Sequence, residues 1–218
     1  MADLDFAVTG VDVVPFAAAP QLAFHLRVNA GQGATVYTVA LRCQIQIEPG
    51  RRNYQPEEQA NLRDLFGEPE RWSRSMRPLL WTHANVVVPR FTDATTVDLV
   101  VPCTFDFNVG ATKYFYGVRD GDLPLCFLFS GTVFYEDQGS LQVAPVSWAK
   151  EANFRLPVAT WRALMDAYYP NSAWLSLQRD AFEKLLDYKV RHGIPTWEQA
   201  IERMLAAASG EVPAEMRS

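Results

Sequence analysis

Alternating apolar and polar positions dominate the first two thirds of the chain. The longest run extends from Val36 to Glu48, where the odd-numbered positions from 39 to 47 are apolar and the even-numbered positions are mostly polar. Alternation with a period of two predicts a long strand with one buried face and one solvated face. Shorter runs predict further strands at residues 4–14, 22–28, 79–88, 95–107, 114–118, 125–135 and 141–146.

Signals between and within these runs indicate how the strands are arranged. Gly and Asn at residues 29–33 tolerate turn conformations, so we expect an antiparallel hairpin joining the strands at 22–28 and 36–48. The strand at 125–135 is apolar on both faces, which is typical of a central strand, and Gly131 within it indicates a bulge.

Eight or nine strands at regular spacing, with turn signals between them, predict the fold class. We expect a mainly β (α+β) chain built on an antiparallel two-sheet β-sandwich. Pro102 cannot donate a backbone hydrogen bond, so its strand should lie at a sheet edge or contain a bulge.

Two parts of the chain change to helical spacing. A short helix is predicted at about 55–66, inserted between strands. Three amphipathic helices are predicted near the C-terminus, at 158–169, 176–192 and 196–207, the last opened by a Thr-x-x-Gln capping box. Three short helices rarely form a core alone, so we expect them to dock on the sandwich.

These elements predict three parts. Residues 1–150 form the sandwich domain with its helical insertion, residues 151–208 form a C-terminal helical subdomain, and residues 209–218 form a flexible tail.

Charge and composition exclude several classes of partner. The chain has 218 residues, a formal net charge of -5 and a pI near 5.2, so it lacks the basic surface that nucleic acid or anionic lipid requires. No run of about 18 apolar residues predicts a membrane span, and no signal peptide is recognised. We therefore predict a cytoplasmic protein with no nucleic-acid partner and no membrane insertion; the oligomeric state stays open.

The candidate chemical groups favour a protein that is not an enzyme. Cys43, Cys103 and Cys126 lie in strand-like runs, where we expect buried, reduced thiols. The three histidines are far apart in the sequence, and no nucleophile elbow, phosphate-binding loop or dinucleotide fingerprint occurs. We predict no catalytic residues, no cofactor and no metal site.

Calcium binding by acidic residues is an alternative with less support. The candidates are Asp3, Asp5 and Asp12, or Asp120 and Asp122 in a turn. Calcium loops usually place more carboxylates at tighter spacing, so turn formation and solvated surface explain these residues better.

The insertion and the segment after it carry residue types that are enriched in protein interfaces. We predict a partner-binding site formed by Arg51, Arg52, Tyr54, Arg71, Trp72 and Arg74. The alternative is that Trp72 and Met76 cover the open end of the sandwich while the arginines are solvated. A second candidate is the aromatic loop 168–174, for which packing onto the sheet is the simpler explanation.

Six segments, in this order, carry a resemblance to a known family: ALRCQIQIEP, LRDLFGEPERW, LLWTH, VPCTFDF, LFSGTVFY and LPVATWRALMDAYYP. With them the chain resembles, from about Leu4 to Leu205, a bacterial family of uncharacterised proteins. Genes of that family tend to lie near clusters for nickel-iron uptake hydrogenases and their maturation factors. The resemblance implies an accessory role and transfers no site residues.

Three functional hypotheses follow. The first is a non-catalytic cytoplasmic accessory or scaffold protein that binds a protein partner, in hydrogenase assembly or maturation, through the Arg/Trp-rich insertion or an exposed sheet edge. The second is a small-ligand or carbohydrate-binding β-sandwich, which requires a concave pocket lined by Trp or Tyr. The third is a hydrolase, which requires His25 or His83 beside a carboxylate and a nucleophile in a cleft.

Overall fold

A computed structural model describes residues 3–104, 109–172, 175 and 177–209. The chain divides into two compact units, Met1–Ser172 and Ala173–Ser218, which are described separately. Within the described residues, no helix is both long enough and apolar enough to cross a membrane.

The long alternating run forms the middle of the larger sheet. Strand β3 (Thr35–Ile47) pairs with β4 on one side and β7 on the other, always antiparallel, and its alternate side chains from Val39 to Ile47 are buried. This six-stranded sheet has the order β4-β3-β7-β8, with β5 paired to β3 and β9 paired to β7. Its other strands are β4 (Leu79–Val88), β5 (Phe91–Thr92), β7 (Asp122–Asp137), β8 (Ser140–Pro145) and β9 (Glu151–Pro157).

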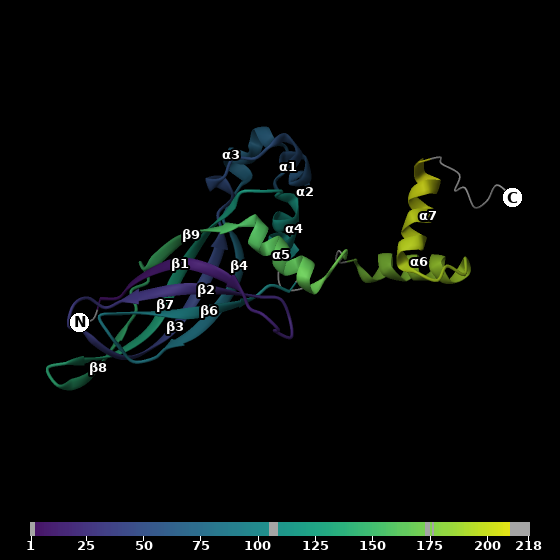
Figure 1. The fold of residues 1–218 in the computed structure, drawn as a ribbon. Coiled ribbons are helices and arrows are strands. Elements are labelled where there is room, and N and C mark those ends of the chain that lie inside the picture. Colours follow the sequence, from purple (N-terminus) through teal and green to yellow (C-terminus); the bar gives the residue numbers. More distant parts are fainter. Residues whose placement is uncertain (1–2, 105–108, 173–174, 176, 210–218) are drawn as a thin grey trace. The chain divides into compact units, whose positions relative to one another are not determined.

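The smaller sheet covers the apolar face of the larger one. It has three antiparallel strands in the order β1-β2-β6, which are β1 (Asp5–Val13), β2 (Gln21–Asn29) and β6 (Ala94–Pro102). Phe24 of β2 is fully buried, and its ring centroid lies 5.1 Å from that of Phe127 in β7 and 6.2 Å from that of Trp81 in β4. The predicted mainly β, two-sheet antiparallel sandwich is therefore confirmed (Figure 1).

The hairpin predicted at residues 29–33 is wrong. Strand β2 pairs with β1 and β6, whereas β3 pairs with β4, β5 and β7, so the loop between them crosses from one sheet to the other. Turn residues allow the chain to reverse, but they do not determine whether the next strand pairs with the last one or packs across the core from it.

Two further strand predictions differ from the structure. The strand predicted at 95–107 ends earlier, and the strand predicted at 114–118 is not a strand. Strand β6 ends at Pro102 on the edge of the smaller sheet, and residues 105–107 lie outside the described residues. Residues Val109–Gly117 form helix α4. Its buried side chains are Ala111, Tyr114 and Phe115, followed by buried Val118. These positions lie three, four and seven residues after Ala111, which is helical spacing.

The sandwich extends further along the chain than residue 150. Strand β9 pairs with β7 from Asp122 to Leu128, and helix α5 (Val158–Tyr168) buries Val158, Trp161, Leu164 and Met165 in the same unit. Strand β9 was not predicted, although its apolar residues Ala152, Phe154 and Leu156 alternate with polar ones, and the two-residue strand β5 was not predicted either. Helix α5 itself lies where it was predicted and packs on the sandwich, as expected.

The second unit consists of helix α6 (Arg179–Arg191) and helix α7 (Trp197–Ser209), close to the predicted bounds. The backbone N–H of Gln199 donates to Thr196 Oγ1 at 3.2 Å, as a capping box requires. The ring of Phe182 lies 5.5 Å from that of Trp197, which joins the two helices into a hairpin. The predicted tail beyond Ser209 lies outside the described residues.

A histidine ties the three strands of the smaller sheet together. His25 in β2 contacts Asp12 of β1 through Nε2 at 2.9 Å and Asp98 of β6 through Nδ1 at 2.8 Å. The hydrogen bond to Asp98, followed by the one to Asp12, raises the pKa of His25 above its ordinary value. The imidazole ring therefore links the two outer strands of the smaller sheet, and each ring nitrogen contacts a carboxylate.

The contacts of His25 with Asp12 and Asp98 predict a specific pH dependence of stability. Because folding raises the pKa of His25, its contribution is complete below the unfolded pKa of about 6.5 and is lost as the pH rises through the folded pKa. The three side chains are partly or largely exposed, so screening limits the contribution to about 1 kcal/mol or less. Urea unfolding of the wild type and His25→Gln, from about pH 5.5 to about pH 8.5, should show this loss in the wild type alone; parallel curves would contradict it.

Candidate functional site at the helical cap

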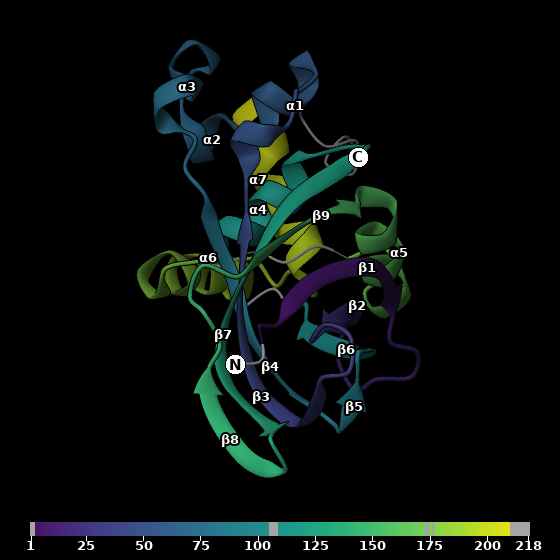
Figure 2. The same cartoon turned by 90° about the vertical axis from the view of Figure 1, so that its left-hand side faces the viewer.

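Short helices cover one end of the sandwich, and β8 lies at the other end (Figure 1, Figure 2). We call residues 49–75 the helical cap; it contains all six predicted partner-binding residues. The elements of the cap are the 3-10 turns η1 (Pro49–Arg51) and η2 (Pro69–Arg71) and the helices α1 (Pro56–Asn61), α2 (Arg63–Phe66) and α3 (Trp72–Ser75). The inserted helix predicted at about 55–66 is therefore present, with a break at Leu62.

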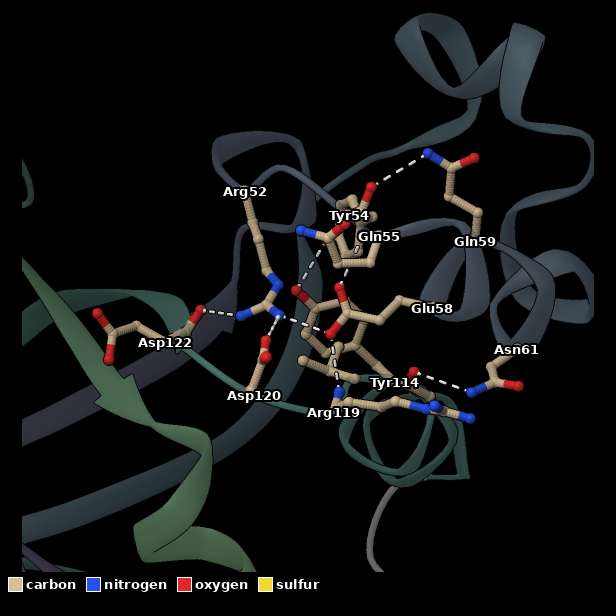
Figure 3. Close-up of polar contacts among 12 residues, drawn as sticks. Arg52, Tyr54, Gln55, Glu58, Gln59, Asn61, Tyr114, Arg119, Asp120 and Asp122 are labelled. Carbon is tan, nitrogen blue, oxygen red and sulfur yellow. Dashed lines mark hydrogen bonds and ion pairs between the residues drawn. The ribbon is translucent and has the colours of Figure 1, made fainter.

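A buried ion pair anchors the cap. Arg52 Nη2 lies 2.7 Å from Glu58 Oε1, and the side chains are 8% and 1% exposed (Figure 3). Arg52 Nη1 donates to the carbonyl of Asp122 at 2.8 Å, and Asp120 lies 3.7 Å from Nη2. The pair thus joins helix α1 to the start of β7, about sixty residues along the chain.

Glu58 also organises the backbone around it. Its carboxylate accepts hydrogen bonds from the backbone N–H of Arg119 at 2.8 Å and of Gln55 at 3.2 Å. Desolvation alone would raise the pKa of Glu58, but the hydrogen bonds from Arg119 and Gln55, together with the charge of Arg52, lower it below its ordinary value. Glu58 is therefore held ionised at the centre of a buried polar cluster, in which Arg52 Nε has no hydrogen-bond partner among the described residues.

Aromatic residues complete the anchor. The Tyr54 hydroxyl donates to the carbonyl of Pro49 at 2.8 Å and lies 2.9 Å from the hydroxyl of Tyr114. Burial raises the pKa of Tyr114 to about 12. Trp72 is 8% exposed, donates from Nε1 to the carbonyl of Gly67 at 2.9 Å, and packs edge-on against Tyr54 and Phe66. These aromatic contacts support the alternative that Trp72 covers the end of the sandwich.

The six predicted partner-binding residues thus separate into two groups. Arg52, Tyr54 and Trp72 face into the cap and hold it together, as described above. Arg51, Arg71 and Arg74 are exposed, although Arg51 is also paired with Glu48 at 2.7 Å. A partner on this surface would meet chiefly the guanidinium groups of Arg71 and Arg74, and their role in binding remains a prediction.

Glu58 and Tyr114 were not predicted from the sequence as members of this cluster. A Gln-x-x-Glu spacing, Gln55 to Glu58, opens helix α1 and is the local signal for a carboxylate that turns back on the helix start. Nothing local indicated that the same carboxylate would be almost fully buried against Arg52.

A small hollow lies beside the cap. Its volume is about 220 Å³, below the range of about 300–1,000 Å³ typical of small-molecule sites. Its lining residues are Glu48, Arg51, Pro124, Leu125, Asn153, Phe154 and Arg155. Arg51 is already engaged there, donating from Nη1 to Asn153 Oδ1 at 2.8 Å. This hollow has no Trp or Tyr in its lining and so does not supply the aromatic pocket that carbohydrate binding requires.

The other candidate groups also have structural contacts. The three cysteines are buried free thiols, and burial raises the pKa of Cys43 and Cys103 to about 12 and that of Cys126 to about 11. Asp3 and Asp5 both pair with Lys150. Among the residues that the structure describes, no group of three or more His, Cys, Asp or Glu is arranged to hold a metal ion.

The aromatic loop predicted as a second partner site packs against the sandwich where it is described. Tyr168 donates to the carbonyl of Ala17 at 2.9 Å, and both Tyr168 and Tyr169 pack against the core. Trp174 lies outside the described residues.

Comparisons with known proteins give a family but no activity. No curated protein matches the chain. A crystal structure of a selenomethionine-labelled β-glucosidase from Kluyveromyces marxianus is similar over 71% of this chain and 15% of its own, with 11% identity and a TM-score of 0.23, too low to support an argument. A family model, described as a family of unknown function (DUF6084), matches residues 1–213. The chain therefore belongs to this family of unknown function.

Proposed function

We propose that the protein is a non-catalytic cytoplasmic accessory or scaffold protein that binds an extended segment of a protein partner along the free edge of β8. The observation that carries this proposal is the chemistry of that edge. Among the described strands, β8 pairs with β7 alone, and its sequence SLQVAP contains no charged residue.

The side chains of β8 favour an apolar partner. Leu141 and Val143 are 61% and 59% exposed and lie on the same face of the strand. Edge strands usually carry charges or bulges that prevent pairing with other chains, and β8 has no charge to do so. An added strand from a partner would satisfy the free backbone groups of β8 and cover both side chains.

Two further observations support the rest of the proposal. The raised pKa values of the buried thiols keep them protonated at neutral pH, so they are poor nucleophiles. The resemblance to a family whose genes lie near hydrogenase clusters makes hydrogenase subunits and their maturation factors the first partners to test. The exposed Arg71 and Arg74 of the cap form the rival surface for the same partner.

Affinity purification from the native cell tests this proposal. We expect the wild type to recover a protein partner, and Leu141→Lys/Val143→Lys to lower recovery of that partner about tenfold, because two desolvated lysines would oppose strand pairing. Phe16→Lys changes an exposed apolar residue outside β8 and should leave recovery unchanged.

Two outcomes would overturn the proposal in different ways. Recovery of no partner by the wild type would remove the protein-binding function. Loss of the partner with Arg71→Glu/Arg74→Glu, but not with the β8 variant, would move the binding surface to the helical cap.

A further inference from the structure

The small hollow beside the helical cap contains an arginine whose guanidinium group is held in place. Arg51 Nε lies 2.7 Å from Glu48 Oε2, and Arg51 Nη1 donates to Asn153 Oδ1 at 2.8 Å. These two contacts fix the plane of the group, although the side chain is 55% exposed. Its Nη2 forms no hydrogen bond to a described residue, so this nitrogen keeps its N–H donors for a ligand.

A second arginine lines the same hollow and has no partner of its own. Arg155 is exposed, and no hydrogen bond or ion pair joins it to another described residue. Asn153 and Arg155 are two residues apart on β9, so they lie on the same face of the sheet with their Cα atoms about 7 Å apart. Because Arg51 is bonded to Asn153, the two arginines bring their positive charges to neighbouring positions on this face.

The lining of the hollow has an uncompensated positive charge. Its charged residues are Glu48, Arg51 and Arg155, which sum to +1 in a chain whose net charge is -5. Glu48 is 15% exposed and already paired with Arg51, so Arg155 supplies the charge that lacks a counterion. The acidic neighbours on the same face of the sheet are Glu151 and Asp122, and neither forms an ion pair with Arg155. A monovalent anion therefore fits better than a divalent one, whose second charge the carboxylate of Glu48 would repel.

The rest of the lining sets the size and shape of the ligand. Pro124, Leu125 and Phe154 form an apolar part beside the two arginines. The volume of about 220 Å³ equals at least about seven water molecules of about 30 Å³ each, so the ligand must be compact. A planar carboxylate matches the fork of a guanidinium group, and a short hydrocarbon chain attached to it suits the apolar residues.

We propose that this hollow is a binding site for a small monocarboxylate. The carboxylate lies between Arg51 and Arg155, and its short hydrocarbon chain packs on the apolar part of the lining. This inference goes beyond partner binding at β8, which lies at the opposite end of the sandwich from the helical cap (Figure 1). Binding of a small acid requires no protein partner, so the site does not depend on the proposed function.

Isothermal titration calorimetry of the full chain with sodium acetate, propionate and butyrate tests the proposal, with sodium chloride holding the ionic strength constant. We expect butyrate to bind with a Kd of about 1 mM. Affinity should rise about two- to fourfold with each added CH₂ group, because a fully buried CH₂ contributes about fourfold. Inorganic phosphate should bind at least about fivefold more weakly than butyrate, because it has a second charge and no apolar part.

Substitutions of Arg155 test the location of the site without disturbing the fold. Arg155→Gln should weaken butyrate binding about tenfold and leave urea unfolding unchanged, because Arg155 contacts no other described residue. Arg155→Lys keeps the charge but lacks the planar fork, so it should recover part of the lost affinity. Arg42→Gln is the matched control: this exposed arginine lies on the same sheet face, about 20 Å along β3 from Glu48, and its loss should leave binding unchanged.

Four outcomes would overturn the proposal. The first is a wild type that releases no more heat with about 50 mM butyrate than with sodium chloride. The second is equal affinity of the wild type and Arg155→Gln, which would place binding elsewhere. The third is equal affinity for the three acids, which would show an ion effect without apolar contact, and the fourth is tighter binding of phosphate than of butyrate. The β8 substitutions should leave butyrate binding unchanged, so the two proposals can fail separately.

Discussion

Replacing Arg52 with methionine (Arg52→Met) should lower the free energy of unfolding by about 3–5 kcal/mol, because it leaves a carboxylate buried without its cationic partner. Glu58 is 1% exposed, so water cannot replace the guanidinium group. The substitution also removes the hydrogen bond from Arg52 to the carbonyl of Asp122, which connects the helical cap to β7. Urea unfolding at neutral pH, followed by circular dichroism and tryptophan fluorescence, measures the loss.

An exposed ion pair of the same cap provides the matched control. Arg63 lies 3.2 Å from Glu68, and both side chains are about 60% exposed, so Arg63→Met should cost less than about 1 kcal/mol. The double variant Arg52→Met/Glu58→Met removes both buried charges and should recover part of the stability lost in Arg52→Met. If Arg52→Met unfolds within about 1 kcal/mol of the wild type, the pair does not anchor the cap.

The strands of the sandwich were largely predictable because their signal is local. In β3, alternate side chains from Val39 to Ile47 are buried, as a period of two requires, and most other predicted strands lie within a few residues of their observed bounds. The antiparallel two-sheet arrangement followed from the number and spacing of such strands. Pairing was harder, since the loop at residues 29–33 has turn chemistry whether it joins neighbouring strands or crosses between sheets.

Helix α4 shows how residue type can mislead when spacing does not. Tyr114, Phe115 and Val118 have high strand propensity, which suggested a strand at 114–118. Together with Ala111, however, they have helical spacing, and helix α4 with the residue that follows it buries all four against the core. Here tertiary packing overrides propensity, so the period of the apolar positions was the better guide.

The candidate site was less predictable than the fold, because burial depends on distant residues. From the sequence alone, Arg52 resembles a surface arginine. In the fold, Glu58 and the turn at 120–122 surround it. Trp72 likewise resembles a binding residue in the sequence, but in the fold its ring packs against Tyr54 and Phe66. Residue types enriched in interfaces are also those that suit buried structural contacts, so composition alone cannot separate the two roles.

Gly131→Ala should destabilise the sandwich by about 4 kcal/mol, because no side chain fits where β7 passes β3. A Cβ atom at this position would lie 2.1 Å from the carbonyl oxygen of Ala40 and 3.1 Å from Leu41 Cα, all backbone atoms that cannot rotate away. Gly131 also has φ of 149°, which L-residues rarely adopt. Strain and overpacking, each about 1–3 kcal/mol, therefore act together at the central strand pair. The pairing with β3 continues in register through Gly131, so close approach rather than the predicted bulge explains the glycine.

Substitutions at two other glycines distinguish the cost of backbone strain from the cost of overpacking. Gly139 has φ of 75° with no heavy atom within 4 Å of a built Cβ, so Gly139→Ala reports backbone strain alone, at about 1 kcal/mol. Gly50 has open space and no positive φ, so Gly50→Ala should be neutral or stabilising by about 0.5 kcal/mol. In urea unfolding, Gly131→Ala should be the least stable variant or already unfolded. Gly139→Ala should come next, and Gly50→Ala should be the most stable of the three. Equal costs for Gly131→Ala and Gly139→Ala would mean that β7 can move away from β3, and that the two central strands are not held at the close spacing described here.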